Sequence, residues 1–143
     1  MLLVTSTLTK SEADPILKKD LLSRPNIKII DDYVDKMEEL YQLSDVYFFP
    51  VVESGHCIDV PLSCMEAAAC GKPIVTTRFG EMKEFCRVKG VKYFDDFDTE
   101  TINARVADAL CCGEVMTRTA ALEYDWQKTI DAFDSYFQEG DLV

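Results

Sequence analysis

Short apolar runs recur along this chain, separated by longer mixed segments. Each run is nearly continuous and rich in β-branched or aromatic residues, with little alternation of polar and apolar positions. Such runs are typical of strands that are buried on both faces of a sheet. The pattern predicts five strands, at Leu2–Ser6, Ile27–Ile30, Val46–Phe49, Ile74–Thr77 and Val91–Phe94.

Between the runs, apolar residues recur every three or four positions, which is the period of a helix packed on one face. Capping residues, prolines and glycines mark where these helices begin and end. The predicted helices run from Pro15 to before Pro25, over Lys36–Leu43, over Pro61–Cys70, from Gly80 to about Val88, from Asp98 to about Leu110 and over Trp126–Gln138.

Strands therefore alternate with helices throughout the chain. This order predicts an α/β fold: a Rossmann-like, mostly parallel sheet of about five strands with helices on both faces. Ligands of such sheets bind at the carboxyl ends of the strands. The loops after Ser6, Phe49 and Thr77 are accordingly the candidate site.

The last predicted helix carries an apolar stripe, which we call the C-terminal stripe. Its members are spaced by four, three and four residues and are Trp126, Ile130, Phe133 and Phe137. We expect the stripe to pack on the sheet. Docking on a neighbouring domain is the alternative.

Composition narrows the class of protein. The 143 residues, 48% of them hydrophobic, fit a single domain spanning residues 1–143. The net charge of −11 argues against a nucleic-acid partner.

No apolar run reaches the roughly 20 residues needed to cross a bilayer. The N-terminus also lacks the basic region of a signal peptide. We expect a cytoplasmic protein, with attachment to the cytoplasmic face of a membrane through a missing domain as the alternative.

The six cysteines indicate neither a metal centre nor a disulfide framework. None forms a C-x-x-C pair, and His56 is the chain's only histidine. We expect small hydrophobic side chains in a reducing compartment, and no metal or other cofactor. His56 beside Cys57 leaves open a metal ligand pair or a base and nucleophile.

The predicted helix after the third strand carries one carboxylate, Glu66, among small and apolar neighbours. A helix N-terminus that follows a strand and a loop favours anion binding, and Glu66 is a candidate acceptor for ligand hydroxyls. Asp59 either caps this helix or contacts ligand. Pro61 removes one amide donor from the first turn.

A second candidate loop follows the fourth strand, at Arg78, Phe79 and Gly80. Gly80 permits a positive φ or a close backbone approach. The first-turn amides of the helix after it are candidates for holding phosphate or sugar hydroxyls. Arg78 either pairs with phosphate or forms a salt bridge on an acidic surface.

Three stretches resemble the retaining glycosyltransferases of the GT-B fold, of the large family-4 type also called glycosyl transferases group 1. They read LYQLSDVYFFP, then IDVPLSCMEAAACGKPIVTTRFGEMKEF, then YDWQKTIDAFDSYF. The resemblance is to the C-terminal, donor-binding domain of these enzymes, that is, the C-terminal half of a GT-B fold. It implies a nucleoside-diphosphate sugar, UDP- or GDP-linked, as the ligand.

The resemblance also implies roles for particular residues. Glu66 matches the second glutamate of the family's paired motif, which holds the nucleotide ribose. Ile58 stands where the first glutamate would contact the donor sugar, so Asp59 or Glu53 would have to substitute. The segment 55–62, with Pro61 and Leu62, matches the backbone that faces the phosphates. Phe79-Gly80 matches the second donor-site loop.

Measured against this family, the chain is expected to lack the first strand–helix unit, with its diphosphate-binding Arg and Lys, and the N-terminal acceptor domain. Alone it would then be inactive, and no catalytic residue is assigned to it. The incomplete sheet would leave edges at which a second copy could pair.

The alternative function is a non-catalytic Rossmann-like module that binds a nucleotide or a partner chain. Ile58, Asp59 and the net charge favour it. A receiver-type domain is disfavoured because Pro50 occupies the strand end where its phosphorylated Asp would stand.

Overall fold

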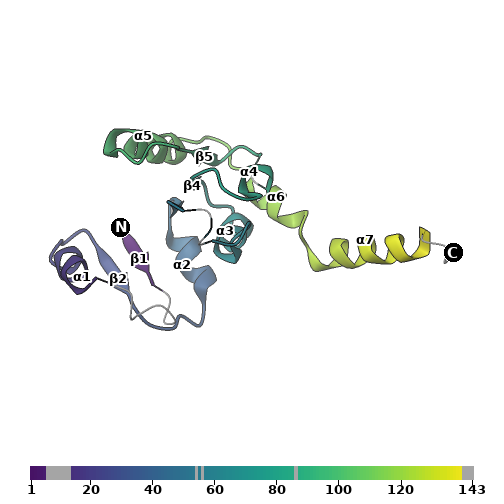
Figure 1. The fold of residues 1–143 in the computed structure, drawn as a ribbon, viewed down its shortest axis with the longest axis horizontal. Helices are drawn as coiled ribbons and strands as arrows, with labels where there is room; N and C mark the ends of the chain where they lie inside the picture. The colour runs from purple at the N-terminus through teal and green to yellow at the C-terminus, as the bar shows by residue number, and fades with distance from the viewer. Residues whose placement is uncertain (6–13, 54, 56, 86, 140–143) are drawn as a thin grey trace. The chain divides into compact units, whose positions relative to one another are not determined.

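The computed structural model describes residues 1–5, 14–53, 55, 57–85 and 87–139 (Figure 1). Within these residues five strands are present: β1 (Leu2–Val4), β2 (Lys28–Ile30), β3 (Tyr47–Phe49), β4 (Ile74–Thr76) and β5 (Val91–Tyr93). The helices are α1 (Pro15–Leu22), α2 (Met37–Leu43), α3 (Leu62–Ala69), α4 (Met82–Phe85), α5 (Thr99–Leu110), α6 (Thr117–Leu122) and α7 (Trp126–Glu139). The chain divides into two compact units, residues 1–37 and 38–143.

The first unit pairs β1 with β2 in parallel, with Leu3 opposite Ile29. Asp14 caps α1 as the sequence predicts, because its carboxylate accepts from the Ile16 amide at 2.8 Å and Pro15 follows as the first helical residue. Beyond the strand ends, Asp31 accepts a hydrogen bond from Thr5 and pairs with Lys18.

The second unit holds a three-stranded parallel sheet in the order β3-β4-β5. All three residues of the central strand β4 are buried. Ile74 packs with Cys64 and Ala68 of α3 on one face, whereas Val75 packs with Ala109 of α5 on the other. Helices therefore cover both faces of this sheet, as predicted for an α/β fold.

The strands are divided differently from the prediction of one sheet. All five predicted strands exist, but they are hydrogen-bonded as a pair and a trio. The apolar pattern identifies a strand by its own side chains, whereas pairing depends on which backbone edges meet in space. Three-residue strands carry few hydrogen bonds that could fix a partner.

Two helical segments differ from the predicted pattern. α6 was not expected, because its six residues are too short for a clear period and its N-cap, Met116, makes no side-chain capping bond. It is held through contacts with the end of α3, since Thr117 donates to the Lys72 carbonyl at 3.0 Å and Arg118 to the Ala69 carbonyl at 2.7 Å. α4 covers four residues only, in place of the longer helix expected from Gly80 to Val88.

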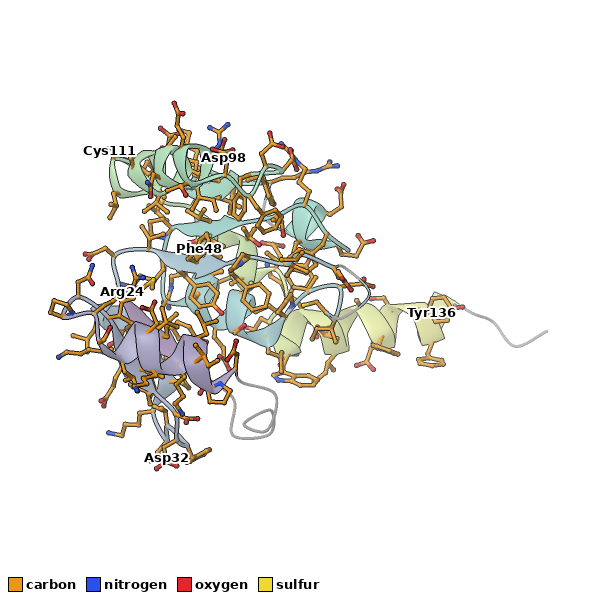
Figure 2. All side chains as sticks on the ribbon, turned by 60° about the vertical axis from the view of Figure 1, so that its left-hand side comes forward. Arg24, Asp32, Phe48, Asp98, Cys111 and Tyr136 are labelled. Carbon is orange, nitrogen blue, oxygen red and sulfur yellow. The ribbon has the colours of Figure 1, made fainter. Side chains whose placement is uncertain are left out.

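The prediction that the C-terminal stripe packs on the sheet is wrong. In α7, Trp126 is 80% exposed and Phe137 71% exposed, and Ile130 and Phe133 are exposed as well. Figure 2 labels Tyr136 on the same helix, and its ring meets that of Phe137 edge-on at 5.7 Å. Periodicity shows that a helix has an apolar face, but not which surface covers it.

None of the helices in the described ranges combines the length and the apolar character that a membrane crossing requires.

Candidate functional site

Threonine hydroxyls join the ends of β3 and β4 at the carboxyl edge of the three-stranded sheet. The Thr76 hydroxyl donates to the Phe49 carbonyl at 2.6 Å. The Thr77 hydroxyl accepts from the Val51 amide at 3.1 Å and donates to the Val51 carbonyl at 2.9 Å. These bonds continue the strand pairing into the candidate loops after Phe49 and Thr77. The third candidate loop, after Ser6, lies outside the described residues.

Replacing Thr77 with Val is expected to destabilise the protein by about 1–3 kcal/mol, because the part-buried Val51 amide and carbonyl both lose their partner. Urea unfolding measures the change. Thr129→Val is the matched control, since its hydroxyl lies on the exposed α7, and it should change stability by about 0.5 kcal/mol or less. Equal losses of stability from Thr77→Val and Thr129→Val would show that the Thr77–Val51 hydrogen bonds do not stabilise the protein.

The two candidate loops touch at Gly80 and Asp59. Gly80 has a φ of +43°, and a Cβ placed on it would lie 2.6 Å from the Asp59 Cα and 2.7 Å from its Oδ1. Only glycine fits this approach without displacing backbone. The structure thus brings Asp59 and Gly80 together from loops that follow different strands.

Phe79, the neighbour of Gly80, belongs to the core. It is 6% exposed and packs with Cys64, Ile74 and Met82. Its ring centroid lies 6.2 Å from that of Phe49. Phe79 therefore anchors the second loop to the sheet.

Arg78 forms the salt bridge that the sequence left as one of two options. Its guanidinium pairs with Asp95 and lies 5.4 Å from the centroid of the Tyr93 ring. Both partners of the ion pair are more than half exposed, so the pair contributes little stability.

The predicted capping role of Asp59 at α3 is wrong. Pro61 is the N-cap, is buried, and makes no side-chain capping bond. Its carbonyl accepts from the Cys64 and Met65 amides, at 2.9 and 3.2 Å. The first-turn amides of Leu62 and Ser63 consequently have no capping side chain, which is the condition for binding an anion at a helix N-terminus.

Two apolar side chains at this end of α3 face solvent. Ile58 is 63% exposed and Leu62 is 68% exposed. Ile58 thus lies on the surface at the position where the resemblance places a sugar-binding glutamate.

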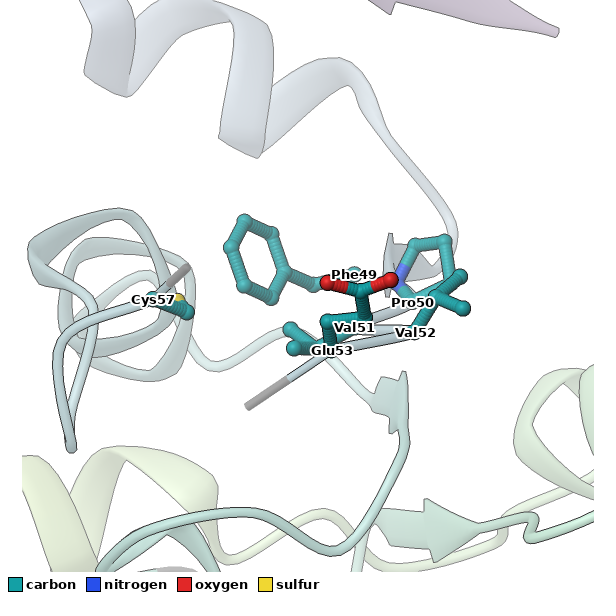
Figure 3. Close-up of a pocket in the computed structure, with 6 residues that line it drawn as sticks. All are labelled: Phe49, Pro50, Val51, Val52, Glu53 and Cys57. Atoms are coloured by element: carbon teal, nitrogen blue, oxygen red, sulfur yellow. The ribbon is translucent and has the colours of Figure 1, made fainter. Parts of the chain in front are cut away.

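A pocket of about 440 Å³ opens beside the end of β3 (Figure 3). It is lined by Phe49, Pro50, Val51, Val52, Glu53 and Cys57. The Glu53 carboxylate gives this largely apolar pocket a hydrogen-bond acceptor. Burial raises the pKa of the Cys57 thiol, which disfavours its thiolate. The pairing of Cys57 with His56, which the sequence only left open, involves a residue outside the described ranges.

Glu66 lies on α3, and its side chain is exposed. Its Oε2 accepts a hydrogen bond of 2.9 Å from the hydroxyl of Tyr41, which is only 5% exposed. Burial, and then the bond to Glu66, raises the pKa of Tyr41, so its hydroxyl stays protonated and donates.

Sequence reasoning missed Tyr41. Within the predicted helix Lys36–Leu43, Tyr41 was assigned no role, and Tyr41 and Glu66 are 25 positions apart. The signal that could have found it is the stretch LYQLSDVYFFP, which contains Tyr41 and carries part of the family resemblance.

Among the described residues, no group of three or more His, Cys, Asp or Glu side chains is placed to hold a metal ion. The side chains and backbone of the site offer carboxylates as acceptors for hydroxyl groups and amides as donors for an anion.

Comparison with protein families gives one result that bears on this geometry. A family model described as glycosyl transferases group 1 matches residues 7–111. The matched segment contains α2, α3 and both candidate loops. A search of curated proteins finds no match.

Proposed function

This chain belongs to the glycosyl transferases group 1 family, and we propose that it binds the nucleoside-diphosphate-sugar donor of a retaining glycosyl transfer. The observation that carries the proposal is the Glu66 carboxylate. It is exposed on α3, yet one of its oxygens is held by a buried tyrosine hydroxyl. A fixed carboxylate of this kind suits the vicinal hydroxyls of a ribose.

The N-terminus of α3 supports the part of the proposal that concerns the diphosphate of the donor. Its uncapped amides and the positive end of the helix dipole favour a phosphate group. Negative charge grows on the diphosphate as it leaves the sugar, so the same amides would stabilise the transition state. Asp59 and Glu53 are acidic and would repel phosphate; we assign them to the hydroxyls of the donor sugar.

The remaining candidate residues would support the donor site through their backbone or through packing. They are Pro61, Leu62, Arg78, Phe79 and Gly80. Gly80 lets the second loop approach Asp59, and Phe79 anchors that loop in the core. Transfer also needs an acceptor site and cations for the diphosphate, and we propose that another domain or chain supplies both. The proposed partner is a UDP- or GDP-linked sugar.

Replacing Glu66 with Ala is expected to weaken UDP or GDP binding at least about tenfold, since hydrogen bonds to a charged group contribute about 1.5–3 kcal/mol. Isothermal titration calorimetry with both nucleotides measures the change. Glu100→Ala is the matched control, because Glu100 is an exposed glutamate on α5, which packs on the other face of the sheet.

If the folded wild-type protein binds neither nucleotide, the proposal fails. It fails equally if Glu66→Ala and Glu100→Ala bind with the same affinity as wild type.

A non-catalytic nucleotide-binding module is the second candidate, and the exposure of Ile58 favours it. Because position 58 carries no carboxylate, the chain would bind the nucleotide but have little affinity for the sugar. This candidate predicts equal affinities for UDP and a UDP-sugar, whereas a donor domain should gain affinity from the sugar. The same calorimetry separates the two.

A further inference from the structure

The hydrogen bond between Tyr41 and Glu66 joins a buried group to an exposed one. Tyr41 lies on α2, and Glu66 lies on α3. The hydroxyl donates to Oε2, and Oε1 has no partner among the described residues. One carboxylate oxygen is therefore fixed from inside the protein, while the other remains open to a ligand.

Tyr41 is itself held in place by its surroundings. Its ring meets the Tyr47 ring edge-on, with centroids 5.5 Å apart and an interplanar angle of 78°. Tyr47 belongs to β3 and stacks on Phe49 at 6.1 Å. Lys72 also donates to the Gln42 carbonyl at 2.8 Å, which ties the end of α2 to the segment after α3.

An exposed glutamate normally samples several rotamers, and ordering it on binding costs conformational entropy. A charge-assisted hydrogen bond from a fixed donor selects one of these rotamers before the ligand arrives. This preorganisation raises the affinity only for ligand groups that hydrogen-bond to the carboxylate.

We infer that Tyr41 is a positioning residue, whose buried hydroxyl orients the Glu66 carboxylate so that Oε1 accepts from the vicinal diol of a nucleotide ribose. This inference rests on the proposed function. It assigns Tyr41 to recognition of the diol, separately from its contribution to the core.

Tyr41→Phe tests the inference because it removes the hydroxyl and keeps the ring. The measurement is the affinity for UDP or GDP and for the matching 2′,3′-dideoxy nucleotide, which lacks the diol. Wild type should prefer the nucleotide with the diol. Tyr41→Phe should lower affinity for that nucleotide about three- to tenfold and leave affinity for the dideoxy nucleotide unchanged.

Tyr47→Phe is the matched control. The Tyr47 hydroxyl is hydrogen-bonded with Ser63, and burial raises its pKa to about 12. The substitution removes a tyrosine hydroxyl from the same aromatic group but not from Glu66, so preference for the diol should persist. Glu66→Ala alone and the Tyr41→Phe/Glu66→Ala double variant should bind equally, since Tyr41 acts through the carboxylate.

Glu66→Asp serves as a second variant if Tyr41→Phe does not fold. It keeps the charge but withdraws the carboxylate by one methylene from the Tyr41 hydroxyl, and it should lose the preference for the diol. Equal weakening of both nucleotides by Tyr41→Phe would show a structural role only and overturn the inference. An unchanged preference would overturn it too.

Failure of the inference differs from failure of the proposed function. If wild type prefers the nucleotide with the diol, and Glu66→Ala abolishes that preference while Tyr41→Phe does not, only the inference fails. If the folded wild type binds neither nucleotide, both fall.

Discussion

Replacing Phe94 with Ala is expected to lower the free energy of unfolding by about 3–5 kcal/mol. Phe94 is 2% exposed and packs with Val75 and Ala109 in the core between β4 and α5. Its ring also meets Phe48, labelled in Figure 2, at 5.8 Å and Phe97 at 5.3 Å. A loss of this size is a large part of the roughly 5–15 kcal/mol that stabilises a typical domain.

Urea unfolding monitored by circular dichroism measures the effect. Phe97→Ala is the matched control, because Phe97 touches the same ring but is 46% exposed, so its loss leaves little cavity. Phe94→Leu keeps most of the volume and should cost less than Phe94→Ala. A similar loss of unfolding free energy for Phe94→Ala and Phe97→Ala would show that burial of Phe94 does not stabilise this part of the core.

Replacing Gly80 with Ala is expected to cost about 2–5 kcal/mol. A positive φ costs an alanine about 1–2 kcal/mol, and overpacking against the Asp59 backbone adds about 1–3 kcal/mol. Relief of the clash would separate the two candidate loops. Thermal unfolding and nucleotide calorimetry together measure both consequences, and nucleotide affinity should fall along with stability.

Gly71→Ala supplies the matched control. Gly71 also has a positive φ, +70°, but nothing lies within 4 Å of a Cβ placed there. Its substitution should cost only the conformational part, about 1–2 kcal/mol, with nucleotide affinity unchanged. If the two substitutions cost the same, the contact between Gly80 and Asp59 contributes nothing to stability or to the site.

The candidate site could be predicted from sequence only where a residue type has few possible roles. A glycine after a predicted strand indicated close backbone approach, and Gly80 does contact Asp59. Arg78 left two options open, and the choice depended on where Asp95 lies after folding. Tyr41 was not singled out, because its partner Glu66 lies on another helix, 25 positions away, and residue spacing does not indicate that contact.

The sequence alone is enough to predict the α/β class, the positions of the five strands and most of the helices. These follow from the period of apolar side chains and from local caps such as Asp14, which act over a few neighbouring residues. It also indicated the glycosyltransferase family that the match over residues 7–111 shows.

The folded structure was needed to establish how the strands pair, where α6 forms and that the C-terminal stripe is exposed. It alone joined Thr77 to Val51, Gly80 to Asp59 and Tyr41 to Glu66. Each of these contacts links residues distant in the chain, and its energy depends on backbone positions that the whole unit sets together. A local pattern of apolar and polar residues does not contain those positions.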